Sequence, residues 1–364
     1  MAVVESVPFR AGTEGYHTYR IPAIVATGAG TLLAFAEGRR DSAGDTGRID
    51  LVLRRSADGG RTWGALQVVA ARDGGGTVGN PAPVVTSGGP IVLVSVQNAA
   101  SATEQKIRRG QVKAEEGRRV YVQRSEDDGA TWTPPREITA SVKRREWRWY
   151  ATTPGHALEL RAGTHAGRIV VPGNHSVPPA KGDTGAEGKY DGGHGLLSDD
   201  SGETWTLGYL DDDPDGRINV NETTAAELPG GRIYLNTRTD STAPGTRADA
   251  YSADGGQTLE APFQAQEGLV GPVVEGSVLQ WPDPEVLLFS GPADPDSRAR
   301  MTIRASEDAG RTWRDALTLS SLPAAYSDLV AVDGETVGLL YETGESGPYA
   351  TITFAAIPIA DMIH

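Results

Sequence analysis

The sequence predicts an all-β protein, a six-bladed β-propeller, because one short phrase recurs along the chain and strand-like runs separate its copies. The phrase S-x-D-x-G-x-T-W begins at Ser56, Ser125, Ser198, Ser252 and Ser306, with leucine in place of tryptophan in the fourth copy. Successive copies lie 54 to 73 residues apart, which is the size of a propeller blade. Aspartate and glycine at fixed offsets favour a turn, since the carboxylate can accept nearby N–H groups and glycine tolerates positive φ. We interpret the phrase as structural, because one carboxylate per copy is too few for a calcium ion.

Between the copies, short runs of alternating apolar and polar residues are bounded by turn residues, as expected for β-strands. The expected strands are 20–26, 32–36, 49–55 and 65–69 in the first unit; 81–85, 91–96 and 120–124 in the second; 156–160 and 169–172 in the third; 220–228, 233–237 and 248–251 in the fourth; 276–280, 286–290 and 301–304 in the fifth; and 326–332, 337–341 and 349–358 in the sixth. Six units of four antiparallel strands form a six-bladed propeller. A short helix is expected at 139–146.

The two ends of the chain are expected to meet in the last blade. The sixth unit lacks a fourth strand, whereas residues 3–9 are strand-like and belong to no unit. The N-terminal strand would therefore complete the last blade and close the ring, which hides sheet edges from aggregation. A β-sandwich is the competing fold, but it does not explain a phrase at the same place in each unit. We expect residues 1–364 to form a single β-propeller domain.

Composition excludes several kinds of partner and site. Lys plus Arg number 34 and Asp plus Glu number 48, a formal net charge of −14, which argues against a nucleic acid partner. No apolar run is as long as a membrane span, so no membrane partner is expected. The chain begins without a recognisable signal peptide, and both a secreted and a cytoplasmic location stay open. Because there is no cysteine and no pair of histidines at metal-ligand spacing, we expect neither a metal nor another cofactor.

Polar residues collect at one end of the expected blades. In an up-and-down blade, the repeated phrases lie at one end, and the start of strand one and the end of strand two lie at the other. The other end gathers Arg20, Arg39, Arg40, Asp45, His156, His175, Glu222, Arg238, Arg298, Tyr326 and Glu342. The longest insertions, 97–118 and 175–193, fall at the same end, and long loops on a rigid scaffold commonly carry sites. The sequence thus predicts a functional site at this end.

Three arginines from different units would point to one place near the axis. Guanidinium groups bind a carboxylate or a phosphate in a bidentate manner. A single arginine is usually a partner in a surface ion pair, but three at equivalent strand ends favour anion recognition. Because the net charge of the chain repels anions, local donors must do this binding. Glu342 ends a second strand beside Arg20 in a closed ring, where it can orient that guanidinium.

Three features of the chain carry a family resemblance. These are the phrase Y-R-I-P at 19–22, the phrase F-A-E-G-R at 35–39, and the repeated S-x-D-x-G-x-T-W phrases, which are called Asp-boxes. In these features the chain resembles the exo-α-sialidases (neuraminidases) of the bacterial and animal type. The resemblance covers essentially the whole chain. It implies a catalytic six-bladed propeller that releases terminal sialic acid, with sialylated glycans or glycoconjugates as partners. It also implies that Arg20, Arg238 and Arg298 bind the sialic acid carboxylate, with Arg300 as a rival for the third place. Arg39, Glu342 and His175 are placed in the same substrate-binding region.

The resemblance implies catalytic roles for three further residues. Asp45 matches the acid/base, with Asp41 and Asp50 as alternatives, Tyr326 matches the nucleophile, and Glu222 matches its partner. A tyrosine nucleophile is a known exception among glycosidases. The anomeric carbon of a sialoside carries a carboxylate, which would repel a carboxylate nucleophile but not a neutral phenol. The phenol has a pKa of ~10, so a base such as Glu222 must take its proton, and the product would retain its configuration.

Three readings of function stay open at this point. The first is a retaining exo-α-sialidase. A close variant would prefer a related nonulosonic acid, such as the deaminated form, or would transfer the sugar instead of hydrolysing it. The third is a non-catalytic sialic-acid-binding propeller. The third is disfavoured, because a lectin needs none of Asp45, Glu222 and Tyr326, and all three are present.

Overall fold

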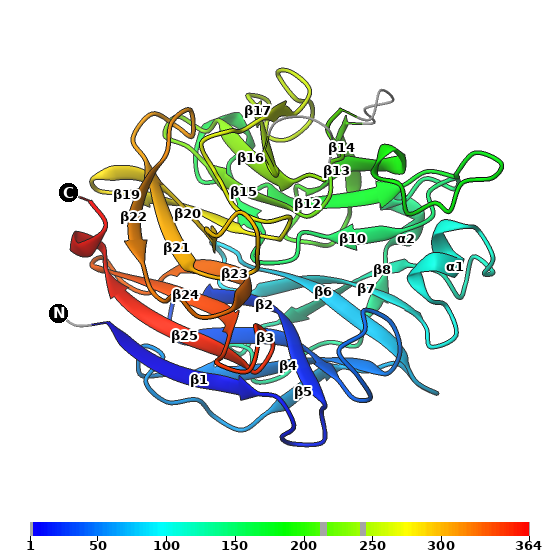
Figure 1. The fold of residues 1–364 in the computed structure, drawn as a ribbon, viewed down its shortest axis with the longest axis horizontal. Coiled ribbons are helices and arrows are strands. Elements are labelled where there is room, and N and C mark those ends of the chain that lie inside the picture. Colours follow the sequence, from blue (N-terminus) through cyan, green and yellow to red (C-terminus); the bar gives the residue numbers. More distant parts are fainter. Residues whose placement is uncertain (1–2, 212–216, 241–244, 364) are drawn as a thin grey trace.

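The computed structural model describes residues 3–211, 217–240 and 245–363. Within these ranges, the regular structure is almost entirely β and is arranged in five sheets (Figure 1). The all-β class is therefore confirmed. Neighbouring strands pair antiparallel in all five sheets, apart from one parallel contact between two residues.

The longest sheet has eight strands and contains two antiparallel groups of four. The first group is β2 (Thr18–Ala26), β3 (Leu32–Arg39), β4 (Ile49–Ser56) and β5 (Gln67–Ala70). The second group is β6 (Gly76–Val85), β7 (Ile91–Ala99), β8 (Arg119–Ser125) and β9 (Arg136–Glu137). One parallel pair, Ile49 with Thr77, joins β4 to β6. The Thr77 hydroxyl also accepts the N–H of Gly47 at 3.2 Å, which ties the two groups together.

The other four sheets are separate blades. One has five strands: β10 (Tyr150–Thr152), β11 (Leu158–Glu159), β12 (Ile169–Ser176), β13 (Asp191–Ser198) and β14 (Thr206–Asp211). Two have four strands each: β15 (Thr223–Glu227), β16 (Ile233–Arg238), β17 (Arg247–Ser252) and β18 (Gln264–Ala265), then β19 (Ser277–Pro282), β20 (Glu285–Pro292), β21 (Met301–Ser306) and β22 (Arg314–Thr318). The last has β23 (Ala324–Ala331), β24 (Thr336–Thr343), β25 (Thr351–Pro358) and β1 (Val4–Arg10).

The propeller with four-stranded antiparallel blades is confirmed, but six separate blades are not found. Four of the five sheets are single blades, and the bridge between β4 and β6 merges the remaining strands into one sheet. The N-terminal strand does close the last blade, because β1 pairs antiparallel with β25 and lies beside it in Figure 1. The first strand of each unit lies innermost, and these strands contact one another in turn around the centre, from β2 through β6, β11, β15, β19 and β23 back to β2, with β10 beside β6 as well.

The third unit departs from the expected pattern. The predicted inner strand 156–160 is replaced by two short strands, β10 and β11, that both pair with β12. Pro154 lies between them, and it has no N–H to donate to a neighbouring strand. The unit therefore has five strands instead of four.

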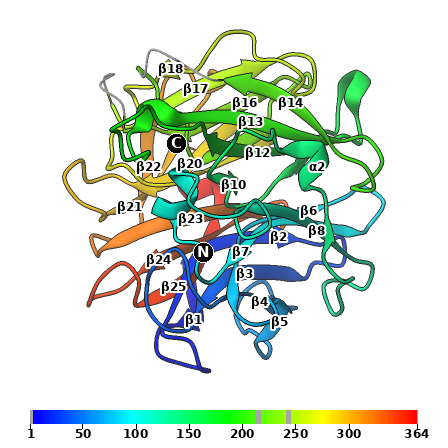
Figure 2. The same ribbon diagram turned by 90° about the vertical axis from the view of Figure 1, so that its right-hand side faces the viewer.

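Helices are few and short. They are α1 (Glu104–Arg108), α2 (Thr139–Val142), η1 (Gly163–His165), η2 (Gly188–Tyr190) and η3 (Ile359–Asp361). The predicted helix 139–146 is correct in place but ends at Val142, because Lys143 is extended, with φ −129° and ψ 124°. Helix α2 lies beside the sheet of β12 to β14 (Figure 2), where Val142 packs with Leu207 and Leu210. Among the described residues, no helix has the length and apolar character needed to span a membrane.

Each repeated phrase forms a self-contained turn, as the sequence predicts. In the first copy, the Asp58 carboxylate accepts the backbone N–H and the hydroxyl of Thr62 at 2.9 and 2.6 Å. The Ser56 hydroxyl accepts the N–H of Gly60 at 2.9 Å. The same bonds recur around the aspartates Asp127, Asp200, Asp254 and Asp308. These carboxylates are thus used within their own turns, so their role is structural.

Apolar side chains fill the spaces between neighbouring sheets. Leu288 and Ile303 of the fifth unit, for example, pack against Leu329 and Leu339 of the sixth, and all four are fully buried. Each inner strand is consequently held from both sides by large apolar contacts. The residues at the ends of these strands therefore sit on a rigid support.

Candidate active site

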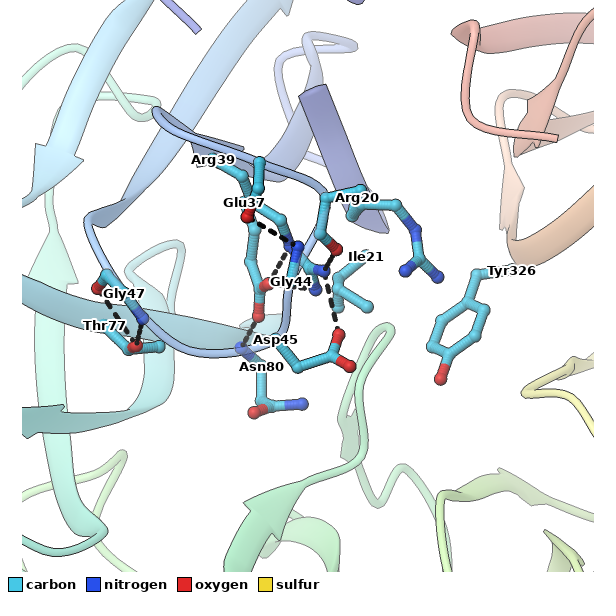
Figure 3. A network of polar contacts seen from close by, with 12 residues as sticks. Arg20, Ile21, Glu37, Arg39, Gly44, Asp45, Gly47, Thr77, Asn80 and Tyr326 are labelled. Carbon is cyan, nitrogen blue, oxygen red and sulfur yellow. Dashed lines mark hydrogen bonds and ion pairs between the residues drawn. The ribbon is translucent and has the colours of Figure 1, made fainter. Parts of the chain in front are cut away.

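A polar pocket opens at the end of the blades opposite the Asp-box turns. It is lined by Ile21, Glu37, Arg39, Asp45, Asn80, Glu104, Arg108, Arg118, Trp149, Ala151, Asn174, Asn221, Glu222, Arg238 and Tyr326. These residues come from four of the five sheets and from the loops between their strands. In Figure 3, Asp45 and Asn80 face the space beside the ring of Tyr326. The lining is dominated by charged and amide side chains, as suits a small polar ligand.

Tyr326, Glu222 and Arg238 form one hydrogen-bonded group at the wall of this pocket. The Tyr326 hydroxyl donates to Glu222 Oε1 at 2.8 Å and accepts from Arg238 Nη1 at 3.1 Å. Arg238 Nη1 also lies 3.0 Å from Glu222 Oε2. The three residues start β23, precede β15 and end β16, so two inner strand starts and one second-strand end bring them together. Arg238 Nε is buried and has no hydrogen-bond partner among the described residues.

Burial controls the protonation of this group. It raises the pKa of the Glu222 carboxyl, and the charge of Arg238 opposes the shift only in part. It also raises the pKa of Tyr326, against the lowering effect of Arg238 and Arg20. In the resting site, the phenol is therefore neutral. A carboxylate with a raised pKa is the stronger base, so Glu222 suits the removal of the phenol proton during attack.

Glu342 organises Arg20 and the start of β23. Its carboxylate accepts Arg20 Nε at 2.7 Å and Arg20 Nη2 at 3.2 Å. It also accepts the backbone N–H groups of Ile21 at 2.9 Å and Tyr326 at 3.1 Å. Glu342 is fully buried and does not line the pocket, so it positions other groups and does not itself face a ligand. The prediction that Glu342 belongs to the substrate-binding region is therefore corrected: it holds Arg20 in place from behind the pocket.

Ile21 has a strained backbone conformation that this arrangement maintains. Its φ is +61°, in the left-handed region, which is unfavourable for a β-branched residue. The pairing of β2 with β3 shifts between Arg20 and Ala23, so a bulge lies at this point. Asn80 in β6 repeats the feature, with φ +51° and its N–H bonded to Glu37 Oε1 at 2.9 Å. Bulges redirect side chains, and here they turn the inner strand starts toward the pocket.

Arg298 lies at the edge of this group. Its guanidinium carbon is 5.9 Å from the centre of the Tyr326 ring, compared with 5.0 Å for Arg20. Arg298 Nη1 donates to the hydroxyl of Tyr349 at 2.9 Å, and Arg20 stacks over the Tyr349 ring at 4.0 Å. The rival Arg300 is exposed and donates to the carbonyl oxygen of Ala293 instead. Arg298 is therefore the better placed of the two.

Asp45 lies at the mouth of the pocket beside Arg39. Its carboxylate is 2.8 Å from Arg39 Nη1, and its side chain is 62 % exposed. Burial would raise the pKa of Asp45, but the charges of Arg39 and Arg20 outweigh this effect and lower it. Figure 3 shows the Asp45 carboxylate directed toward the space beside Tyr326.

The two alternatives to Asp45 lie elsewhere. Asp41 is exposed and pairs with Arg48. Asp50 is buried and accepts from the Tyr16 hydroxyl at 2.8 Å, and neither carboxylate lines the pocket. The geometry therefore favours Asp45 over both.

His175 does not belong to the pocket. It is fully buried, stacks on Trp147 at 3.7 Å between ring centres, and lies 3.0 Å from His194 between their Nδ1 atoms. The prediction that it contacts substrate is wrong, because its side chain turns into the core between sheets. His156 is likewise engaged, with its backbone N–H and its ring bonded to the buried Asp328.

Sequence reasoning missed several residues of this region. Tyr349 lies in the loop between β24 and β25, and an aromatic residue in a second-strand loop at this end was the available signal. Arg118, at the end of the insertion between β7 and β8, stacks on Trp149 at 3.8 Å and donates to the Asn80 side chain at 3.3 Å. No group of three metal-ligating side chains is found in the described part of the chain.

Among known proteins, the chain is similar to a BNR-repeat family and to sialidases. A family model described as a BNR repeat-like domain matches residues 30–340. The sialidase of Micromonospora viridifaciens is 34% identical over 94% of this chain and 53% of that protein. The exo-alpha-sialidase of Aspergillus fumigatus is 32% identical over 90% of this chain and 79% of that protein. The chain thus spans about half the length of the first relative and most of the second.

Solved structures agree with these matches. A Hadza microbial sialidase superimposes with a TM-score of 0.84 at 27% identity, covering 99% of this chain and 69% of that one. A leech intramolecular trans-sialidase superimposes with a TM-score of 0.81, covering 97% of this chain and 70% of that one. The second pair shares only 16% identity, so that likeness concerns the fold alone.

Proposed function

Because this chain belongs to the sialidase family with BNR repeats, we propose that it is a retaining exo-α-sialidase that releases terminal sialic acid from glycoconjugates. The observation that carries the proposal is the 2.8 Å hydrogen bond from the Tyr326 hydroxyl to Glu222, with Arg238 bonded to both. A buried phenol held by a base and a cation is the expected arrangement for an activated nucleophile.

The carboxylate of the sugar is assigned to Arg20, Arg238 and Arg298. Arg20 is fixed by two bonds to Glu342, and Arg238 has a buried Nε that no described residue uses. Guanidinium groups bind carboxylates with charge-assisted hydrogen bonds of defined geometry. Once the carboxylate is bound, the anomeric carbon attached to it is held near Tyr326.

The first chemical step forms a bond from the Tyr326 oxygen to the anomeric carbon while the glycosidic C–O bond breaks. The phenol proton passes to Glu222, and the leaving oxygen takes a proton from Asp45. In the second step, the oxygen of a water molecule attacks the anomeric carbon while Asp45 takes a proton from that water. The bond to Tyr326 breaks, and Glu222 returns the proton to the phenolate. Two inversions at one carbon give net retention.

Asp45 must be protonated for the first step. In the resting site, its pKa is lowered by Arg39 and Arg20 against the effect of burial. A bound substrate carboxylate neutralises part of that positive charge, and the substrate displaces water from the pocket. Both changes raise the pKa of Asp45, so substrate binding prepares the acid.

We also assign six blades and a single catalytic domain to residues 1–364. The eight-stranded sheet divides into two antiparallel groups of four that share only the contact of Ile49 with Thr77. Counting these groups as two blades accounts for the unbroken contacts between inner strands around the centre.

Product analysis tests the proposed function. The protein is incubated with 3′- and 6′-sialyllactose, and the released sugar is followed by proton NMR from the first minutes. Initial release of the α-anomer is expected, whereas initial release of the β-anomer would refute the double displacement. A panel of other nonulosonic acids and added lactose acceptors separates hydrolysis of sialic acid from a different specificity or from transfer. Binding without release would identify a non-catalytic protein.

A further inference from the structure

A basic groove lies beside the polar pocket. It is formed by the segment between β7 and β8 and by the segment between β9 and β10, both at the end of the blades that carries the pocket. Its charged lining residues are Lys113, Arg118, Arg119, Lys143, Arg144, Arg145 and Arg148, and none of the described residues that line it is a carboxylate. The chain as a whole carries a net charge of −14, so the groove has the opposite sign to the rest of the molecule.

Among the described residues, Arg119 of the basic groove has a carboxylate partner, whereas the partners of Lys143 are uncharged. Arg119 pairs with Glu137, outside the groove lining. The Lys143 ammonium donates to the carbonyl oxygens of Arg118 at 2.8 Å and Arg148 at 3.2 Å, which are uncharged acceptors. Burial and then the charges of Arg118, Arg119 and Arg148 lower the pKa of Lys143 to about 7. An anion in the groove would relieve this repulsion.

Two guanidinium Nε donors in the basic groove lack a hydrogen-bond partner in the described part of the chain. Arg118 Nε and Arg148 Nε are buried and make no hydrogen bond to any described residue. Arg118 as a whole is only 3% exposed, so its charge is desolvated and held in place by the ring of Trp149. Arg118 Nη1 already donates to the Asn80 side chain at 3.3 Å, so the unsatisfied group is its Nε, and a buried donor without an acceptor is costly.

Arg118 connects the basic groove to the polar pocket, because it lines both. Burial raises the pKa of Asp45, and the charge of Arg118 lowers it together with the larger effects of Arg39 and Arg20. Asp45 is the group assigned to protonate the leaving oxygen. The sugar attached to that oxygen must therefore leave the pocket on the side of Asp45, which is the side on which Arg118 and the groove lie.

We propose that the basic groove binds an anionic group, a carboxylate or a sulfate ester, on the sugars to which the sialic acid is attached. The inference rests on the proposed function, since it places the rest of the substrate relative to the catalytic pocket. Guanidinium and ammonium groups form charge-assisted hydrogen bonds with either anion. The enzyme would then prefer oligosialylated or sulfated glycans to glycans whose only anionic group is the terminal sialic acid.

The test compares three substrates: sialyllactose, α2,8-linked disialyl-lactose, and sialyllactose with a sulfate ester on galactose. We expect kcat/KM to be about tenfold higher for at least one of the two substrates that carry a second anionic group than for sialyllactose, mainly through KM. The preference should shrink at high salt, because ions screen these contacts. Preference for only one of these two substrates would identify the second anion as a carboxylate or a sulfate ester.

Charge removal in the groove provides the second arm. The double variant Lys113→Gln/Arg145→Gln changes two exposed groove residues that lie outside the polar pocket. It should lose most of the preference and keep the parent rate on sialyllactose. The matched control is Arg61→Gln/Arg311→Gln, which removes the same charge from exposed positions in Asp-box turns at the other end of the blades. This control should keep the preference.

The outcomes separate the two proposals. Equal kcat/KM in the parent enzyme for sialyllactose and for both sialosides with a second anionic group would overturn the basic groove as a binding site while supporting the sialidase activity. Hydrolysis of no sialoside would overturn the proposed function. In that event, titration of the protein with sulfated and unsulfated lactose still decides the matter, because tighter binding of the sulfated sugar supports the groove and equal binding refutes it.

Discussion

Replacement of Tyr326 by phenylalanine tests the chemistry most directly. The change removes one oxygen, and with it the 2.8 Å bond to Glu222 and the 3.1 Å bond from Arg238. Glu222 keeps its ion pair with Arg238, so no unpaired charge is created. Loss of one phenol–carboxylate hydrogen bond should lower the free energy of unfolding by ~1–3 kcal/mol. Loss of the nucleophile should lower kcat/KM by about a thousandfold or more, equivalent to ~4 kcal/mol of transition-state stabilisation.

Tyr16→Phe is a matched control for this experiment. The Tyr16 hydroxyl donates to the buried Asp50 at 2.8 Å, the same distance and the same pair of groups, but outside the polar pocket. Asp50 also keeps an arginine partner, Arg40. The two variants should therefore lose similar stability, while only Tyr326→Phe loses turnover.

The assay combines thermal unfolding, turnover of a fluorogenic sialoside and equilibrium binding of free sialic acid. In Tyr326→Phe, the dissociation constant for sialic acid should stay within a factor of about three, because the arginines that bind the carboxylate remain. Equal turnover in the Tyr326 and Tyr16 variants would remove Tyr326 from the mechanism. A large loss of binding with unchanged kcat would instead make it a binding residue.

Three further predictions concern Arg238, which is assigned to the sugar carboxylate, Tyr349 beside Arg298, and Asp58 in an Asp-box turn. Arg238→Ala should raise KM for sialosides at least tenfold, because it removes a guanidinium bonded to both Tyr326 and Glu222. Equal affinity for sialic acid in mutant and parent would show that Arg238 does not bind the sugar carboxylate. Tyr349→Phe removes the hydroxyl that accepts from Arg298 but keeps the ring under Arg20, so KM should rise a few-fold with kcat unchanged, and a large fall in kcat would contradict this positioning role. Hydrogen bonds from Thr62 hold the pKa of Asp58 at about 2. Because the pKa of this carboxyl is lower in the folded than in the unfolded chain, its ionised form stabilises the folded state. This stabilisation is complete above the unfolded pKa of ~3.9 and is lost as pH falls toward 2. Thermal midpoints measured from pH 5 to pH 2 should therefore fall less steeply for Asp58→Asn than for the parent, and identical slopes would rule out a contribution from this carboxylate.

Much of the fold could be predicted because it depends on local patterns. The Asp-box forms its own hydrogen bonds within seven or eight residues, so its turn is encoded where it occurs. Strands alternate in direction, and counting them assigns each residue to one end of a blade. The ends of the chain could be paired in the same way, since β1 completes the sheet of β25. The bridge that merges two blades could not be foreseen, because it involves a single contact of Ile49 with Thr77.

The candidate site, like the fold, could be predicted from the sequence only in part. The sequence by itself determined which end of the molecule carries Arg20, Glu222, Arg238 and Tyr326, because strand parity and short phrases are properties of the chain. Only the tertiary structure decided that Arg298 approaches Tyr349, that His175 turns into the core, and that seven basic residues, Arg118 among them, form a groove beside the polar pocket. These outcomes depend on packing between loops far apart in the sequence. Periodicity says which way a strand runs, but it does not say how two loops meet across neighbouring sheets.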